Sequence, residues 1–196
     1  MLCPETPSPD IMSQGPQENE IKLAAADPAA VRSLLRRVGF RLARRRVFEA
    51  NTVFDTARLT LRRGCRLLRL RQAGRAVTLT FKGPPLPGPY KTREELETSL
   101  PDAARFAAIL ARLGFHPVFR YEKYRTEFRM ERGPGMAMLD ETPIGVYLEL
   151  EGPPAWIDRT ARRMGFSQRD YITASYASLY LDWCKQQRRK ARNMVF

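Results

Sequence analysis

The chain has 196 residues, with 34 Lys and Arg against 21 Asp and Glu, a formal net charge of +13 and a pI near 10.3. This length suits one domain with a substantial core, and the excess of positive charge indicates a polyanionic partner: nucleic acid, an anionic membrane or a phosphorylated metabolite. The sequence shows neither a basic segment followed by an apolar run at its start nor a stretch of ~18 apolar residues, which argues against a signal peptide and a membrane-spanning helix.

The first segment, residues 1–17, is rich in proline and has no apolar periodicity, so we predict a disordered leader. We expect the folded domain to occupy residues 18–184. The last segment, residues 185–196, is predicted to be a basic tail.

Three segments share one helical design. In the first, Asp27 precedes Pro28, apolar residues recur on one face, and Gly39 ends the pattern, as expected for an N-cap, a proline at the first helical position and a glycine after the last. The same features predict helices over 27–39, 102–114 and 154–165, with Asp102 as a second cap. A fourth helix is predicted from Tyr171 to about Arg188.

Short runs of alternating polar and apolar residues lie between these helices and are separated by turn residues. They predict about eight strands, at 18–24, 46–54, 66–72, 76–82, 93–98, 118–130, 136–140 and 146–151. Strands together with a few helices make an α+β protein.

The charged residues of these strands recur at every second position. Residues two apart in a strand point to the same face, so Glu18, Glu20 and Lys22 share one face while Ile21 and Leu23 take the other. The same alternation places charge on one face of the other strands, through Arg69, Arg71, Lys82, Lys91, Arg93, Glu95, Glu97, Lys123, Arg125, Glu127, Glu149 and Glu151.

Two architectures explain such a pattern. An antiparallel sheet with one face in water alternates in the same way and is common. However, the charges cluster, and the opposite faces and the helices supply enough apolar surface to pack together. We therefore favour a closed antiparallel β-barrel whose interior is charged and whose helices pack outside.

A lumen with charges of both signs has a direct chemical use. A triphosphate carries roughly four negative charges, which basic side chains would bind, arginine bidentately and lysine as a point charge. Carboxylates facing the same phosphate would repel it unless a divalent metal lay between them. Mg²⁺ or Mn²⁺ held by Glu18, Glu20, Glu149 and Glu151 would resolve this conflict.

Six motifs in order resemble those of the CYTH superfamily, the triphosphate tunnel metalloenzymes. They are Glu18-x-Glu20-x-Lys22, the strands 68–71 and 93–97, the turn 80–84, the strand 122–125, and Leu139-Asp140 followed by 145–151. Residues 52–55 and 66–68 lack the Tyr and Trp of thiamine triphosphatases, which argues against thiamine specificity. The overall spacing, the Gly-Phe helix endings and Ser175-Tyr176 look closest to class IV adenylate cyclase-like proteins.

The resemblance implies an eight-stranded tunnel and a metal-dependent reaction at a triphosphate. It makes Asp140 a metal-site candidate beside the four glutamates. The implied phosphate-binding residues are Lys22, Arg69, Arg71, Lys82, Lys123 and Arg125. Lys22, Glu95 and Glu97 are the candidate catalytic residues; the two glutamates would either orient a water or hydroxyl or hold the neighbouring Arg and Lys in place.

Three functions remain open from the sequence. The favoured one is an adenylate cyclase that converts ATP to cyclic AMP and pyrophosphate, and the alternative is a triphosphatase acting on inorganic or organic triphosphate. A binder of polyphosphate or nucleic acid is disfavoured, because it would not need the metal carboxylates and the aromatic residues of a stacking platform are absent.

The cysteines Cys3, Cys65 and Cys184 lie far apart and lack the spacing of a zinc or redox site. They predict a reduced, cytoplasmic protein. The sequence leaves monomer and homodimer equally open.

Overall fold

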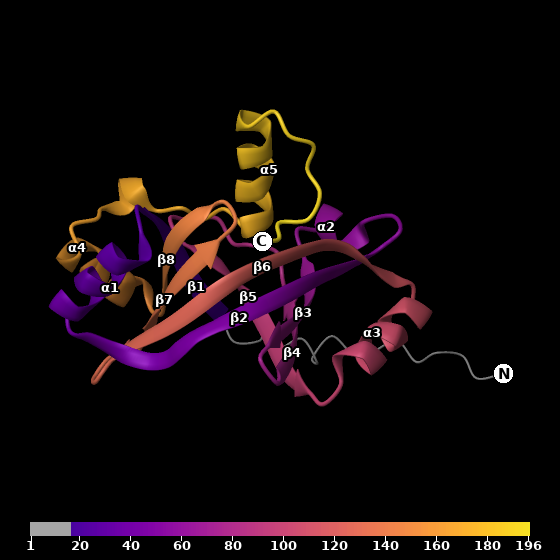
Figure 1. Cartoon of the computed structure of the whole chain (residues 1–196), viewed down its shortest axis with the longest axis horizontal. Coiled ribbons are helices and arrows are strands. Elements are labelled where there is room, and N and C mark those ends of the chain that lie inside the picture. The colour runs from indigo at the N-terminus through magenta and orange to yellow at the C-terminus, as the bar shows by residue number, and fades with distance from the viewer. Residues whose placement is uncertain (1–16) are drawn as a thin grey trace.

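Eight antiparallel strands form the centre of the computed structural model, which describes residues 17–196 (Figure 1). They are β1 (Gln17–Ala25), β2 (Phe40–Thr56), β3 (Leu67–Ala73), β4 (Ala76–Lys82), β5 (Lys91–Leu100), β6 (Phe115–Met130), β7 (Met136–Thr142) and β8 (Gly145–Glu151). The predicted leader lies outside the described residues, except for Gln17, with which β1 begins.

The sheet closes on itself in the order β1-β5-β4-β3-β2-β6-β7-β8, with β8 pairing back to β1. The predicted closed barrel is therefore confirmed. β2 is much longer than predicted, because the arginine-rich residues 41–46 continue the strand and pair with the end of β6 through two register shifts. Residues 41–46 are mostly charged and do not alternate with apolar residues, so the alternation did not predict this extension.

The helices are α1 (Pro28–Arg37), α2 (Thr60–Arg63), α3 (Ala103–Arg112), α4 (Pro154–Arg163), the 3₁₀ helix η2 (Gln168–Asp170) and α5 (Tyr176–Gln186). The Asp27 carboxylate accepts from the N–H groups of Ala29 and Ala30, and the Asp102 carboxylate from that of Arg105, so both predicted caps are confirmed. α2 was not predicted; its single turn is too short to show periodicity.

The last predicted helix starts five residues later than expected. Residues 171–175 are extended, with Ile172 bridged to Lys22 of β1, and the hydroxyl of Ser175 accepts from the N–H of Ser178 to cap α5. The backbone pairing with β1 therefore sets where the helix can begin.

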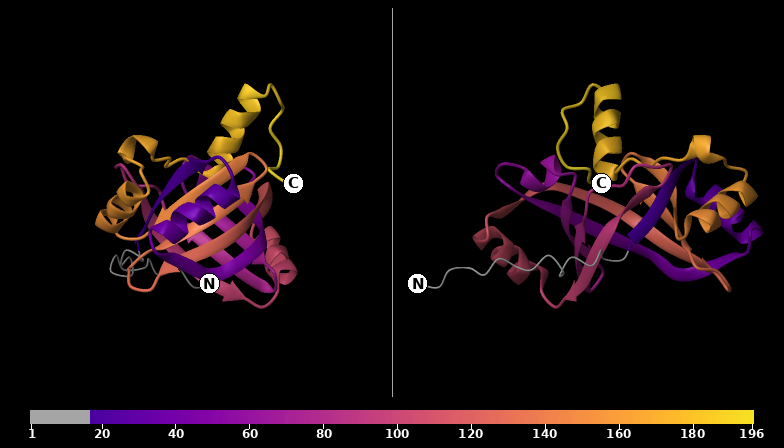
Figure 2. Two further views of the ribbon diagram at one scale, coloured as in Figure 1. Left: turned by 60° about the vertical axis from the view of Figure 1, so that its left-hand side comes forward. Right: turned by 180° about the vertical axis from the view of Figure 1, so that it is seen from behind.

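Apolar residues pack between the outside of the barrel and the helices. The largest cluster joins Ile21, Leu35, Leu148, Leu150 and Ile157, under α1 and α4. Figures 1 and 2 show these two helices together at one end and α3 at the other, where Leu110 packs on Phe54 and Leu70. The apolar sides of the strands therefore face outward and pack against the helices, and the charged sides face the lumen.

The C-terminal residues also pack on the barrel. α5 stands away from the strands, and the chain then returns along it (Figure 2). Met194 is buried and exchanges backbone hydrogen bonds with Arg120 and Glu122, on the part of β6 that β7 does not reach. No helix in residues 17–196 is long and apolar enough to span a bilayer.

Truncating the outer core should destabilise the barrel. Leu150 of β8 is 0% exposed and Leu96 of β5 is 48% exposed. We expect Leu150→Ala to lower the free energy of unfolding by about 2–5 kcal/mol and the matched Leu96→Ala by less than about 1 kcal/mol, measured by urea unfolding. Equal losses in the two variants would contradict this account of the core.

Candidate active site in the barrel lumen

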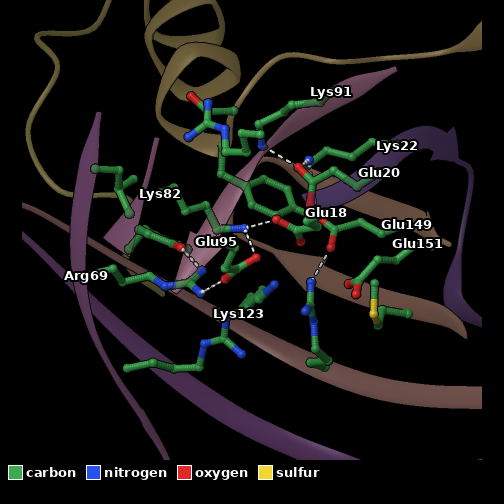
Figure 3. Close-up of a pocket in the computed structure, with 18 of the residues that line it drawn as sticks. Glu18, Glu20, Lys22, Arg69, Lys82, Lys91, Glu95, Lys123, Glu149 and Glu151 are labelled. Carbon is green, nitrogen blue, oxygen red and sulfur yellow. Dashed lines mark hydrogen bonds and ion pairs between the residues drawn. The ribbon is translucent and has the colours of Figure 1, made fainter. Parts of the chain in front are cut away.

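The lumen encloses a cavity of about 260 Å³ lined by charged side chains from six of the eight strands (Figure 3). Eight of the lining residues are basic and seven are acidic. The parity of the charged strands therefore predicted the lumen face correctly. Such a lining is stable only where opposite charges meet, because an unpaired charge away from water is costly.

The strand register supplies those pairs. Residues directly opposite each other on neighbouring strands share a face of the sheet, and in several of these pairs the two side chains carry opposite charges. The pairs that form ionic contacts in this way are Lys22–Glu149, Lys82–Glu95, Lys91–Glu20, Lys123–Glu49 and Arg125–Asp140.

Asp140 anchors the basic side of the lumen. It is 0% exposed and accepts hydrogen bonds from Lys123 Nζ at 2.8 Å, Arg125 Nε at 2.7 Å and the hydroxyl of Tyr176 at 2.7 Å. Burial alone would raise its pKa, but Arg125 and Lys123 hold the pKa well below the ordinary value. Asp140 itself does not line the cavity. Its contacts instead orient Lys123 and Arg125, which do line the cavity.

Arg69 and Arg71 of β3 extend the basic side. Arg69 donates to the hydroxyl of Tyr121 at 3.1 Å and to Thr80 Oγ1 at 3.1 Å. Arg71 is held less firmly: its Nε lies 3.9 Å from Glu49 Oε2 and lacks a hydrogen-bond partner among the described residues. Its guanidinium is therefore more available for a phosphate oxygen than that of Arg69.

The four glutamates predicted to hold metal come together on β1 and β8, which are adjacent in the barrel. Glu20 contacts Lys22 and Lys91. Burial would raise the pKa of Glu20, but these lysines hold that pKa well below the ordinary value. Burial and the proton that it shares with Glu95 raise the pKa of Glu18 to about 8. Burial and the nearby Glu20 also raise the pKa of Glu151.

These carboxylates fit a hard divalent cation. Carboxylate oxygens are the ligands that Mg²⁺ and Mn²⁺ take, and in the strand register Glu20 and Glu151 lie directly opposite each other, so two carboxylates meet there. Lys22, Lys82, Lys91 and Arg125 hold three of the four glutamates. Residues 17–196 accordingly contain no group of three or more acidic, His or Cys side chains already gathered around one point.

The two candidate catalytic glutamates of β5 differ in their contacts. Glu95 lies 2.8 Å from Lys82 Nζ and 3.7 Å from Arg69 Nη2, and its pKa is lowered to about 2: burial opposes the shift, while the proton shared with Glu18 and the charge of Lys82 favour it. Glu97 lines the same cavity, but its side chain is exposed and no ion pair holds it within residues 17–196. Glu95 therefore has the better defined position.

Helix α5 closes one side of the lumen. Tyr176, its first residue, places its ring 5.3 Å from Lys22 Nζ and 5.2 Å from Lys123 Nζ, and its hydroxyl donates to Asp140. The ring lies beside both ammonium groups, and Tyr176 itself lines the cavity.

A second, larger cavity of about 900 Å³ adjoins the lumen, and we call it the vestibule. α2, the proline-rich loop 83–90 and α5 surround it. Its apolar wall consists of Val53, Leu67, Leu86, Val118, Phe119 and Leu181. Arg62, Arg66, Arg93 and Arg192 add positive charge, so the vestibule suits an organic group attached to an anion.

Several residues of the site were not among the sequence candidates. The alternation places Lys91 on the charged face, but Lys91 is not among the predicted site residues. Tyr121 lies two positions from Lys123, so its parity could have indicated it. Glu49 lies in a predicted strand for which no lumen face is assigned from the sequence. Tyr176 gave no such signal, because its place depends on the packing of α5 against the barrel.

A family model described as "CYTH domain" matches residues 16–176. A protein of Methanocaldococcus jannaschii that is provisionally named an adenylate cyclase is 30% identical over 135 residues, which cover 68% of this chain and 75% of that protein.

Two solved structures share the fold. One is a provisionally named adenylate cyclase of Vibrio parahaemolyticus, with a TM-score of 0.73 and 18% identity over 85% of this chain and 98% of that one. The other is a Hippeastrum protein described as an adenylyl cyclase with a dominant triphosphatase activity, with a TM-score of 0.59 and 18% identity over 89% and 97% of the two chains.

The buried ion pairs should make the fold sensitive to acid. The folded-state pKa of Glu49 is lowered to about 2 from 4.5, burial being outweighed by Lys123 and Arg125. A lowered carboxyl pKa stabilises the fold fully above the unfolded value and progressively less as the pH falls toward the folded value. We therefore expect the melting temperature to fall between about pH 5 and pH 2.

The variant Glu49→Gln removes this ionisation and should show a shallower fall over the same range, measured by thermal unfolding at each pH. Glu131→Gln is the matched control, because Glu131 is exposed. Parallel profiles for wild type and Glu49→Gln would contradict the contribution of the Glu49 ion pair.

Proposed function

This chain belongs to the CYTH domain family, and on that premise we propose that it is a metal-dependent adenylate cyclase. The lumen acts on a triphosphate, and the M. jannaschii relative supports the cyclase reaction. The observation that carries the proposal is the vestibule: it opens from the lumen and gives an organic group a place beside the triphosphate, which inorganic triphosphate would not need.

The lumen favours a triphosphate on electrostatic grounds. Its basic side chains are already positioned by carboxylates, so they need little reorganisation to bind phosphate oxygens. Arg69, Arg71, Lys82, Lys123 and Arg125 would make these contacts. Lys22 would act as a further point charge between Glu20 and Glu149, at 2.9 Å and 3.3 Å.

Mg²⁺ or Mn²⁺ would bind at Glu18, Glu20, Glu149 and Glu151. Its positive charge would reduce the repulsion between these glutamates and the roughly four negative charges of the triphosphate. When bound, such an ion neutralises phosphate oxygens and makes phosphorus more susceptible to attack. Asp140, the fifth sequence candidate, instead positions Lys123 and Arg125 in this proposal.

In the proposed reaction the ribose 3′-hydroxyl oxygen bonds to the α-phosphorus, the bond from that phosphorus to the β-phosphate oxygen breaks, and pyrophosphate leaves. The hydroxyl proton needs an acceptor. We assign this role to Glu95, because it is one lumen position along β5 from Arg93, which lines both cavities. Glu97 lies one position farther from the vestibule.

Hydrolysis is the second candidate, and the activity described for the Hippeastrum protein favours it. A water would then take the place of the hydroxyl, with the same groups neutralising phosphate. The intact carboxylates argue against simple binding of polyphosphate or nucleic acid.

A cytoplasmic location stays a prediction; Cys65 and Cys184 are free thiols.

The first test is a product assay. We expect the purified protein with ATP and Mg²⁺ or Mn²⁺ to form cyclic AMP and pyrophosphate in equal amounts, quantified by chromatography. Inorganic phosphate from ATP or triphosphate without cyclic AMP would establish the triphosphatase instead. No product from either compound would overturn both candidates.

The metal site can be tested at Glu151, which lines the lumen and forms no ion pair in residues 17–196. Glu151→Gln should raise the metal concentration for half-maximal activity by roughly 10- to 100-fold without unfolding the protein. The control is Glu141→Gln, because Glu141 pairs with Arg46 outside the lumen. An unchanged metal requirement in Glu151→Gln would remove this residue from the site.

A further inference from the structure

Along β2, β3 and β6, the lumen and the vestibule meet at a sharp chemical boundary. There Val53, Leu67 and Phe119 line both cavities and are apolar, whereas β5 contributes Lys91 and Arg93 to both cavities. The next lumen-facing residue along β3 is Arg69, and along β6 it is Tyr121. The wall therefore changes from apolar to polar within one step along two strands.

Tyr121 stands on the polar side of this boundary. It lines the lumen and is 7% exposed. Its hydroxyl oxygen accepts from Arg69 Nη1 at 3.1 Å, and no described residue accepts the hydroxyl proton. A hydroxyl whose oxygen is engaged and whose proton is free is oriented to donate to a ligand in the cavity.

The ring of Tyr121 is fixed in place. It stacks on Phe119 with ring centroids 5.9 Å apart and lies 6.3 Å from the ring of Tyr176. Its backbone is bridged to Met194 on the outer edge of β6. The hydroxyl is therefore held without the loss of side-chain freedom that a mobile donor would suffer on binding.

The charges around Tyr121 suit an anionic acceptor. Burial would raise the pKa of its phenol, but Arg69, Lys123 and Arg71 outweigh it and lower the pKa. A more acidic hydroxyl donates more strongly, and hydrogen bonds to a charged group are roughly twice as strong as neutral ones.

The residues opposite Tyr121 leave polar atoms without partners. Asn51 lies directly opposite both Tyr121 and Arg71 in the strand register and is 0% exposed. Both polar atoms of its side chain, and the Nε of Arg71, lack a hydrogen-bond partner among the described residues. Buried polar groups are normally satisfied, so this layer of the barrel suits a polar group at the boundary.

We propose that Tyr121 contacts the substrate, donating its hydroxyl proton in a hydrogen bond to the phosphoryl group that joins the triphosphate to the organic part. This inference rests on the proposed function, since it places the triphosphate in the lumen and the organic group in the vestibule. In the cyclase reaction that phosphoryl group is the α-phosphoryl. Its oxygens change position around the phosphorus as the 3′-hydroxyl attacks. The contact should then act mainly on kcat.

The test compares Tyr121→Phe with Tyr147→Phe. Both remove only a hydroxyl from the aromatic cluster that also contains Tyr176, but Tyr147 does not line the lumen cavity. With ATP and metal, we expect kcat to fall roughly 10- to 100-fold in Tyr121→Phe, with KM within about 3-fold of wild type. Tyr147→Phe should match wild type, and thermal unfolding should show both variants folded.

Sulfur substitution identifies the phosphoryl group. Sulfur accepts hydrogen bonds poorly, so one diastereomer of ATP with sulfur on the α-phosphoryl should lose most of the rate difference between wild type and Tyr121→Phe. ATP with sulfur on the γ-phosphoryl should keep it. An unchanged difference with both α-diastereomers, or wild-type kinetics in Tyr121→Phe, would overturn the proposal.

A binding measurement separates this inference from the proposed function. Calorimetry would use inorganic triphosphate and the α,β-methylene analogue of ATP, each with metal. Wild type that binds neither compound would refute both the function and the inference. If wild type binds the analogue, and Tyr121→Phe matches wild type in both this binding and catalysis, the role of Tyr121 alone would be refuted.

Discussion

Enclosing charge inside a closed barrel is the constraint on which the rest of this structure depends. Fifteen charged side chains line a cavity of about 260 Å³, where water cannot solvate each one. They are tolerated because the register places a carboxylate opposite six of the eight basic lining residues, as with Lys22 and Glu149. The outward sides of the same strands must then supply the hydrophobic core, which they do under α1, α3 and α4.

The same pairing prepares the site for its ligand. A triphosphate entering the lumen meets cations that are already desolvated and oriented, so their attraction for phosphate is stronger than in water. Asp140 illustrates the arrangement, because it holds Lys123, Arg125 and Tyr176 together from behind the cavity. Glu20 of β1 and Glu151 of β8 lie directly opposite each other in the register, and this is where we propose that a divalent metal binds.

The tunnel is asymmetric, and this asymmetry bears on the choice of substrate. On one side α5 brings Tyr176 against the lysines of the lumen. Beside it the vestibule offers an apolar wall next to arginines. Inorganic triphosphate would occupy only the lumen, whereas a nucleotide would occupy both cavities in the arrangement that we propose. The boundary at Tyr121 is where the two parts of such a substrate would join.

The sequence by itself determined which residues face the lumen, because alternation along a strand fixes the face of Glu18, Lys22, Arg69 and Glu149 whatever the strand pairs with. It also fixed the capped helices at Asp27 and Asp102, since capping is local. It could not determine the register, which decides that Lys91 meets Glu20 and that Asp140 lies behind Lys123. The start of α5, the return of Met194 to β6 and the vestibule were decided by tertiary structure alone, because they depend on contacts between segments far apart in the chain.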